Sequence, residues 1–168
     1  MTIAILAGGS ESWNEFRRQH PECLVLNDTA LPHAELAHAD LHAVILMESD
    51  LRGANLACAR LERAVLRKTD FCFSNLQEAV LDGADLFRTN LSGADLRNAS
   101  LTSSFLKGAN LCGTDLRGVD LSTAMGLTDS QLLQALGDDR TRLPDGIARP
   151  PTWMALNHVN GNGDHAAK

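Results

Sequence analysis

Residues 81–121 read LDGADLFRTNLSGADLRNASLTSSFLKGANLCGTDLRGVDL, and every fifth residue of this stretch is a leucine. The spacing extends back to Leu26, so that twenty consecutive positions from 26 to 121 carry Leu, or Phe at position 71. A period of five matches neither the 3.6 residues of a helical turn nor the alternation of a flat strand. The pattern therefore predicts a solenoid whose repeats each turn a corner and send one large side chain inward.

The other positions of the repeat indicate a narrow interior and tight corners. Two residues before each central leucine, positions 24 to 119 hold ten Ala, seven Ser or Thr, two Val and one Leu, and close packing leaves no room there for larger groups. The residue just before the leucine is Asp or Asn in eleven of the twenty repeats, and the second residue after it is Gly in six. These residue types favour hydrogen-bonded turns, so we interpret the acids as turn residues.

The stretches GADLFRTNLSGADLRNASLT (83–102) and GANLCGTDLRGVDLS (108–122) closely resemble the A(D/N)LXX consensus of the pentapeptide-repeat family. The resemblance covers residues 22–125. It implies an all-β solenoid, namely a right-handed quadrilateral β-helix with four repeats per coil and about five coils. With ~4.8 Å between stacked strands, such a rod would be roughly 24 Å long.

Both ends of an open β-helix expose unpaired backbone, so we expect each end to be capped by a short α-helix. Residues 1–21 precede the repeats, and a cap helix is predicted over Ser12–His20 because Ser12 and Glu15 form a capping-box pattern. Trp13 and Phe16 would then lie on the first coil. The short apolar stretch at residues 2–7 is interpreted as an added edge strand.

Residues 126–156 predict a second cap helix followed by an extended, Pro-rich segment. Thr128 and Gln131 form another capping-box pattern, and Gly137 suits a helix end. The expected apolar face of this helix consists of Leu132, Leu133 and Leu136. Residues 157–168 are rich in Asn, Gly and His and are expected to be disordered. Both flanks resemble those of bacterial pentapeptide-repeat proteins, which implies a self-contained solenoid.

Composition and cysteine spacing favour a cytoplasmic protein with one domain. The chain has 168 residues and a formal net charge of −6, with no apolar run long enough for a membrane span and no basic segment typical of a secretory signal. Cys72 and Cys112 would share a face two coils apart, ~10 Å by the stacking distance, which is too far for a disulfide. We therefore expect the thiols of all four cysteines to be reduced.

The sequence contains no arrangement typical of a catalytic or metal site. His33, His38 and His42 fall on three different faces of the first coil, so they are interpreted as solvated corner residues rather than as zinc ligands. There is no Gly-rich phosphate loop, nucleophile elbow or His-centred triad. We predict a protein that is not an enzyme and that holds no cofactor or metal.

Folding the sequence at a period of 20 separates four faces, of which one is apolar. A contiguous apolar patch marks a covered or interacting surface, so we predict that this stripe binds a partner. The residues of the stripe are Val25, Ile45, Met47, Val65, Phe87 and Phe105. The alternative is that the carboxy-terminal segment folds back over part of the stripe and places Trp153 near Phe105.

Two functions remain open. The first is a non-enzymatic scaffold or interaction module that binds an unidentified protein, or a second copy of itself, through the stripe. The second is implied by the family resemblance, because its best-understood members bind DNA gyrase by resembling duplex DNA and protect it from drugs. Such mimicry needs a near-continuous acidic stripe, whereas Arg97 and Arg117 interrupt the row of Glu35, Asp95 and Asp115. Neither direct nucleic-acid binding nor membrane binding is expected.

Overall fold

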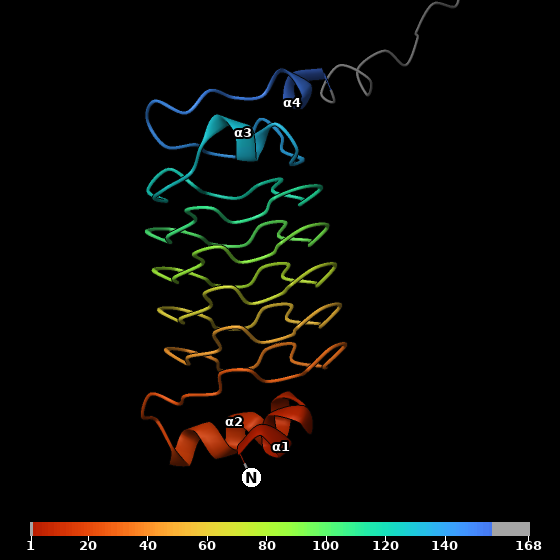
Figure 1. The fold of residues 1–168 in the computed structure, drawn as a ribbon, viewed down its shortest axis with the longest axis vertical. Coiled ribbons are helices and arrows are strands. Elements are labelled where there is room, and N and C mark those ends of the chain that lie inside the picture. Colours follow the sequence, from red (N-terminus) through yellow and green to blue (C-terminus); the bar gives the residue numbers. More distant parts are fainter. Residues whose placement is uncertain (1, 156–168) are drawn as a thin grey trace, which may run out of the picture.

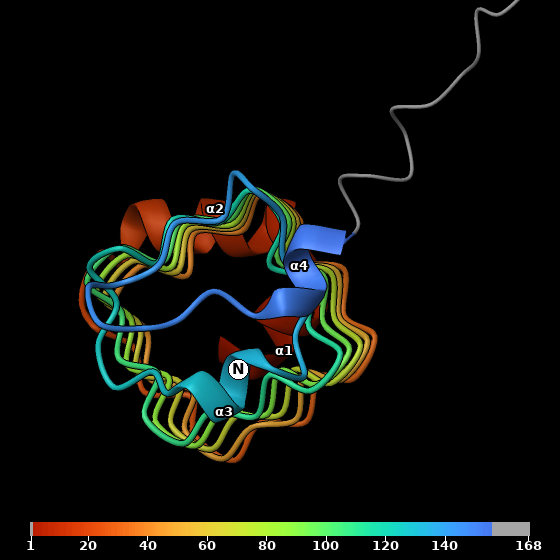
Figure 2. The ribbon, with the colours of Figure 1, turned by 90° about the horizontal axis from the view of Figure 1, so that it is seen from above.

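The computed structural model describes residues 2–155, and a stack of similar coils occupies most of its length (Figure 1). Val25 forms a parallel bridge with Ile45, and the same 20-residue step recurs at every fifth residue up to the bridge of Phe105 with Met125. A coil therefore takes 20 residues, which is four repeats, and equivalent residues of successive coils lie above one another (Figure 2). This register confirms the predicted solenoid.

The corners of the coils have a uniform backbone conformation. The second residue after the central leucine has a positive φ, between 53° and 74°, in nineteen consecutive repeats from Asp28 to Gly118. Glycine occupies six of these corners, and the others hold side chains in the left-handed region that most residues avoid. Within residues 2–155 the coils pair through isolated bridges rather than long strands, because only one bridged residue fits between two successive corners.

The interior contains the predicted leucine ladder, and its side chains are buried from Leu26 to Leu121. The hydroxyl-bearing residues at the narrow position are also buried, and the threonines at positions 69, 89 and 114 donate to backbone carbonyls of the coil below. Thr69 Oγ1 donates to the Leu46 carbonyl at 2.6 Å, and Thr89 Oγ1 donates to the Leu66 carbonyl at 2.7 Å. A small polar side chain thus satisfies its hydrogen bond without widening the core.

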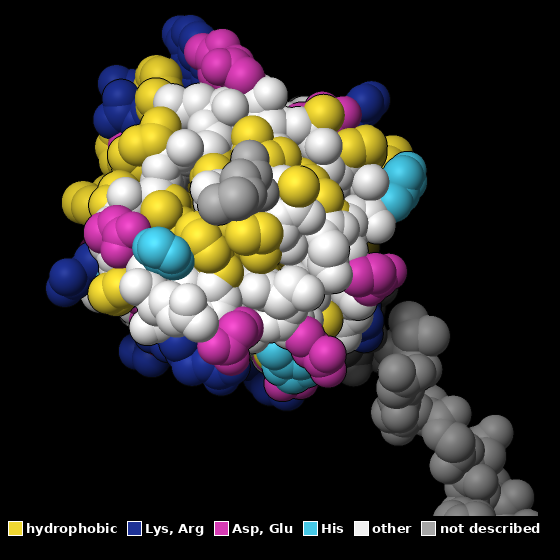
Figure 3. All heavy atoms as spheres, turned by 90° about the horizontal axis from the view of Figure 1, so that it is seen from below, with side chains coloured by type: hydrophobic (Ala, Val, Ile, Leu, Met, Phe, Trp, Pro, Cys, Tyr) yellow, Lys and Arg dark blue, Asp and Glu magenta, His cyan; other side chains and the backbone are white. Residues whose placement is uncertain are grey.

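Two helices lie at the amino-terminal end, α1 (Thr2–Ala7) and α2 (Ser10–Gln19). The prediction of an edge strand at residues 2–7 was wrong. These residues form a helix, which satisfies its own backbone hydrogen bonds and buries Leu6 in the core. Figure 3 shows hydrophobic side chains gathered over the middle of this end. Among the hydrophobic residues of α1, Ile3 is exposed.

Helix α2 packs on the first coil through Trp13, as expected, but it does not begin as expected. Trp13 is buried and its Nε1 donates to the Asp40 carbonyl at 2.7 Å. Phe16 is partly buried against the same core. The capping box predicted at Ser12 is absent, because the helix begins at Ser10 after Gly9 and has no side-chain cap hydrogen bond.

At the carboxy-terminal end, helix α3 (Asp129–Leu132) begins with the predicted capping box of Thr128 and Gln131. It has only four residues, so the predicted helix through Leu136 was wrong: Leu132 is buried, whereas Leu133 and Leu136 are exposed. Leu136 instead forms a parallel bridge with Asp115, which continues the coil.

The chain then crosses the end of the solenoid to helix α4 (Pro151–Ala155) (Figure 2). The prediction of disorder at residues 157–168 concerns residues outside the described part.

No helix within residues 2–155 has the length and apolar character needed to span a membrane.

Candidate protein-interaction surface

The Asp and Asn residues that precede the central leucines have a structural role in every case. In all eleven repeats with Asp or Asn at this position, Oδ1 accepts a hydrogen bond from the backbone N–H two residues later. For example, the Arg97 N–H donates to Asp95 at 3.1 Å. The prediction that these residues are turn residues is confirmed, and the seven Asp carboxylates among them need no functional explanation.

The stripe predicted from the sequence occupies one face of the solenoid, which we call the stripe face. Val25, Ile45 and Val65 lie directly above one another through successive parallel bridges, and Asp85 and Phe105 continue the column. Met47 and Phe87 occupy the neighbouring column, after the central leucine. The structure thus places all six predicted stripe residues on the same face.

The stripe is open to solvent at both ends. Val25 is 64% exposed, and Met125, which bridges to Phe105, is 52% exposed. The residues between them are half-buried, as expected for side chains in contact with their neighbours above and below. Met125 was not predicted as a stripe residue because it follows the last leucine of the ladder, although its 20-residue spacing from Phe105 was a usable signal.

An ion pair divides the stripe into two parts. Arg67 Nε lies 2.6 Å from Asp85 Oδ2, one coil above, in the middle of the face. Above this pair, the rings of Phe87 and Phe105 stack with centroids 6.3 Å apart. The guanidinium groups of Arg67 and Arg88 lie 5.8 and 5.2 Å from the Phe87 ring. The upper part of the stripe is therefore aromatic and basic, whereas the lower part is aliphatic.

The carboxy-terminal segment packs at the end of the solenoid. Trp153 is buried, its Nε1 donates to the Ala135 carbonyl at 2.9 Å, and its ring lies against Gly137. Met125, directly above Phe105, remains exposed. The described part of the tail thus leaves the upper end of the stripe face open.

The face with the most carboxylates is not a continuous acidic surface. Asp95 pairs with Arg97 at 2.7 Å, and Asp115 pairs with Arg117. Burial acts to raise the pKa of Asp95, but the hydrogen bonds and positive charge of Arg97 outweigh this effect, so its pKa lies below the ordinary value. Asp95 and Asp115 are thus each neutralised within their own repeat.

A second exposed hydrophobic position lies at a corner of another face. Phe73 is 76% exposed, and its ring lies over Gly93 of the next coil, where an added Cβ would come within 2.5 Å of the ring. Phe73 is a single residue flanked by glycine corners at 53 and 93, so it forms no contiguous patch with them.

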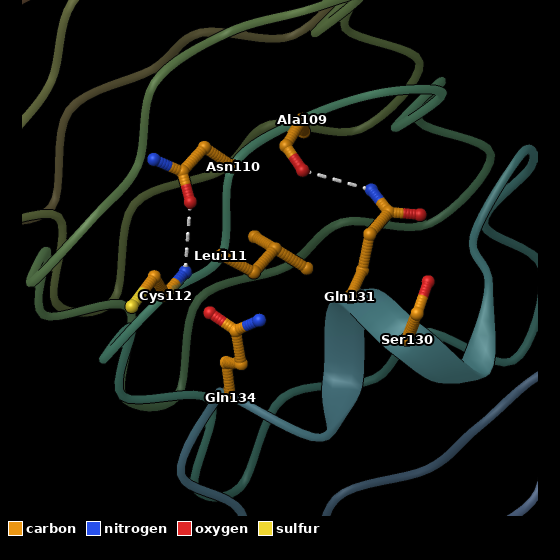
Figure 4. Close-up of a pocket in the computed structure, with 7 residues that line it drawn as sticks. All are labelled: Ala109, Asn110, Leu111, Cys112, Ser130, Gln131 and Gln134. Carbon is orange, nitrogen blue, oxygen red and sulfur yellow. Dashed lines mark hydrogen bonds between the residues drawn. The ribbon is translucent and has the colours of Figure 1, made fainter.

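A hollow of about 250 Å³ lies beside α3, where the last coil is incomplete (Figure 4). Gln131 Nε2 donates to the Ala109 carbonyl at 2.9 Å, in place of the backbone N–H that the next coil would supply. The hollow is thus explained by the end of the repeat. Among the described residues, no three His, Cys, Asp or Glu side chains are grouped as a metal site would require.

Comparison with known proteins agrees with the repeat and its register. The family model for pentapeptide repeats matches in eight copies, in overlapping segments that together span residues 25–124. The chain belongs to the pentapeptide-repeat family. No curated protein matches the chain.

Solved structures of this family resemble the chain. Rfr23, a pentapeptide repeat protein from the cyanobacterium Cyanothece 51142, is 25% identical with a TM-score of 0.50, and the match covers 77% of this chain and 97% of that chain. A pentapeptide repeat protein from the Arabidopsis thaliana thylakoid lumen is 28% identical with a TM-score of 0.38, covering 61% and 71%. The plasmid-mediated fluoroquinolone resistance protein QnrB1 is 19% identical with a TM-score of 0.44, covering 75% and 80%. The likeness to Rfr23 supports the β-helix solenoid fold.

Proposed function

We propose that this protein is a non-enzymatic interaction module that binds another protein chain through the stripe face. The observation that carries the proposal is the column of Val25, Ile45 and Val65, which resumes beyond Asp85 with Phe105 and Met125, on a solenoid whose other columns are mainly polar. An apolar column of this length is typical of an interaction surface.

The architecture supports such a role because it holds the stripe rigidly. We propose a right-handed β-helix of about five coils, with the helices at its two ends acting as caps. Backbone hydrogen bonds between successive coils hold the stripe: the Val65 N–H donates to the Val44 carbonyl at 2.9 Å, and the Val65 carbonyl accepts from the Leu46 N–H at 2.9 Å. A partner would therefore bind a preformed surface, with little ordering of the backbone. A cytoplasmic location fits the four unpaired cysteines and is part of the proposal.

Gyrase protection by DNA mimicry has less support. A DNA-binding site that is built to receive phosphates favours a continuous row of negative charge. On the most acidic face, Arg97 lies 3.8 Å from Asp115 as well as pairing with Asp95, so positive groups are interleaved with the acids. A supercoiling assay with purified gyrase and a quinolone would detect protection if it occurs.

Hydroxyl-radical footprinting tests the proposed function on the stripe itself. The isotopically labelled protein is added at high dilution either to buffer or to an extract of the cells that make it, and side-chain oxidation is measured by mass spectrometry. We expect Met47, Phe87 and Phe105 to be oxidised less in the extract, because a bound protein would cover them.

Phe73 provides the internal control, since it is strongly exposed but lies away from the stripe face. Its oxidation should be the same in buffer and extract. Equal oxidation of Met47 in the two conditions would mean that the stripe is a solvated surface, and the proposal would then be abandoned.

A further inference from the structure

The edge of the stripe face carries a row of charged corner residues whose sign changes along the rod. We call it the charge row, and its members from the amino-terminal coil upward are Asp28, Glu48, Lys68 and Arg88. All four side chains are exposed, and all four residues have the same left-handed corner conformation, with φ between 55° and 57°. The lower half of the row is thus acidic and the upper half basic.

The inner two members of the row pair with each other, whereas the outer two have no such partner. Lys68 Nζ lies 2.6 Å from Glu48 Oε1. Among the described side chains, Asp28 and Arg88 take part in no ion pair. Arg88 instead leans over the ring of Phe87, which directs its charge toward the stripe. Each end of the row therefore presents an unpaired charge beside the stripe.

The charges of this row are complementary to those of a second copy of the row that runs in the opposite direction. In a two-fold dimer with antiparallel rods, each row would meet the partner's row in the opposite order. Asp28 would then face the partner's Arg88, and Glu48 would face the partner's Lys68. Ile45 would lie opposite the partner's Val65, so the aliphatic part of the stripe would fill the centre of the contact.

A parallel dimer would not have this complementarity. Its two-fold axis would run parallel to the rods. Each charge row would then face the opposite edge of the partner's stripe face, with residues of the same coil facing each other. That edge carries Ala43, Arg63 and Gly83. Lys68 would then face the partner's Arg63, and this juxtaposition of like charges is unfavourable.

We infer that the stripe face binds a second copy of this chain in antiparallel orientation, with the two-fold axis crossing the rod between Glu48 and Lys68. This inference rests on the proposed function, which it deepens by naming the partner. From its first to its last member each row takes three steps between coils, about 14 Å at the spacing of stacked strands, which is short for a protein interface. The dimer is accordingly weak, in the micromolar range, and its stability falls as the salt concentration rises.

Sedimentation velocity of the full chain over a range of concentrations tests the inference. The wild type should shift from monomer to dimer as the concentration rises. Arg88→Glu places an acid opposite Asp28 and should weaken the dimer by about tenfold or more, because like charges then meet twice in the symmetric contact. The matched control is Arg63→Glu, which makes the same charge change at the other edge of the stripe face. In the antiparallel dimer Arg63 lies opposite the partner's Ala43, so this control should leave the dimer unchanged.

A row-reversed variant tests the orientation independently of any loss of folding. Its substitutions are Asp28→Arg, Glu48→Lys, Lys68→Glu and Arg88→Asp, which keep the composition of the chain and use residue types already found at corners. This variant should form dimers with itself as the wild type does. It should not form mixed dimers with the wild type, because acid would then face acid.

Three results would overturn the inference. The first is a wild type that stays monomeric at every concentration. The second is a change in dimer stability on Arg63→Glu, in either direction, that is as large as the loss on Arg88→Glu. The third is the formation of mixed dimers between the wild type and the row-reversed variant. If the purified chain stays monomeric while the extract still protects Met47, the proposed function holds and only the identity of the partner is wrong.

Discussion

The indole ring of Trp153 lies against Gly137, sixteen residues earlier in the chain, and fills the space that a side chain at position 137 would occupy. A Cβ added to Gly137 would come within 2.4 Å of the ring. Trp153 is also fixed by the bond from its Nε1 to the Ala135 carbonyl. This contact holds the segment that crosses the carboxy-terminal end of the solenoid.

Gly137→Ala should therefore loosen that segment and lower the free energy of unfolding by about 1–3 kcal/mol, as expected for overpacking. Chemical denaturation measures the loss. In a Trp153→Ala background the same substitution should have almost no effect, because the obstructing ring is gone. Equal costs in the two backgrounds would show that Gly137 does not act through Trp153.

Leu66→Ala tests the leucine ladder in the middle of the rod. Leu66 is fully buried between the coils above and below, so its truncation should lower the free energy of unfolding by about 2–5 kcal/mol. Leu26→Ala, in the first coil, should cost less because the end of a stack can fray locally. Equal losses at the two positions, measured by denaturant titration, would argue against a stack of nearest-neighbour repeats.

Arg17→Ala should destabilise the amino-terminal end. Arg17 is buried, and its guanidinium donates to the carbonyls of His20, Glu22 and His42 at 2.8–3.0 Å. Removing it leaves these carbonyls without that donor and should cost about 2 kcal/mol or more. The neighbouring Arg18 is exposed and pairs with Glu15 on the surface, so Arg18→Ala should change the melting temperature little.

Two substitutions of Asp95 distinguish the contribution of its turn hydrogen bond from the contribution of its charge. Asp95→Asn keeps the acceptor for the Arg97 N–H and should cost less than about 1 kcal/mol, whereas Asp95→Ala removes that acceptor and should cost about 1 kcal/mol more. Similar values for the two variants would contradict the turn interpretation.

The lowered pKa of Asp95 also predicts a dependence on pH. Its carboxylate contributes stability above the unfolded value of about 3.9, and this contribution is lost as the pH falls through the lower folded value. The difference in stability between the wild type and Asp95→Asn should therefore narrow on acidification.

The middle of the chain was predictable from its sequence because a single pattern determines it. The leucine period fixes which side chain points inward, and the 20-residue register places Val25, Ile45 and Val65 in one column. The turn role of the acids followed from residue type alone. These features repeat in every coil, so the conformation that each repeat favours locally is also the one that stacking on its neighbours requires.

The two ends were less predictable because the repeat does not extend to them. At the carboxy-terminal end the bridge of Asp115 with Leu136 spans 21 residues and that of Asp120 with Arg142 spans 22, so insertions shift the register and hide the continuing coil. Thr141 Oγ1 still donates to the Leu116 carbonyl, as Thr114 Oγ1 donates to the Leu91 carbonyl within the regular repeat. At the other end, the bonds of Arg17 depend on tertiary contacts that no local pattern indicates.

The most direct test of the proposed interaction surface compares Val65→Asp with Val80→Asp. Both positions precede a central leucine in the middle of the rod and are half-buried, and Asp is the residue that the repeat often places there, so both variants should fold. Val65 lies on the stripe face, whereas Val80 bridges Arg60 and Ser100 on another face. The measurement is radical footprinting of Met47 and Phe87 in native extract.

We predict that Val65→Asp loses the protection of Met47 and Phe87, because an unpaired carboxylate is costly to bury in an apolar contact, and that Val80→Asp retains it. The melting temperatures of the two variants should be similar. Protection that persists in Val65→Asp, or that disappears in both variants, would contradict the assignment of the stripe face as the interaction surface.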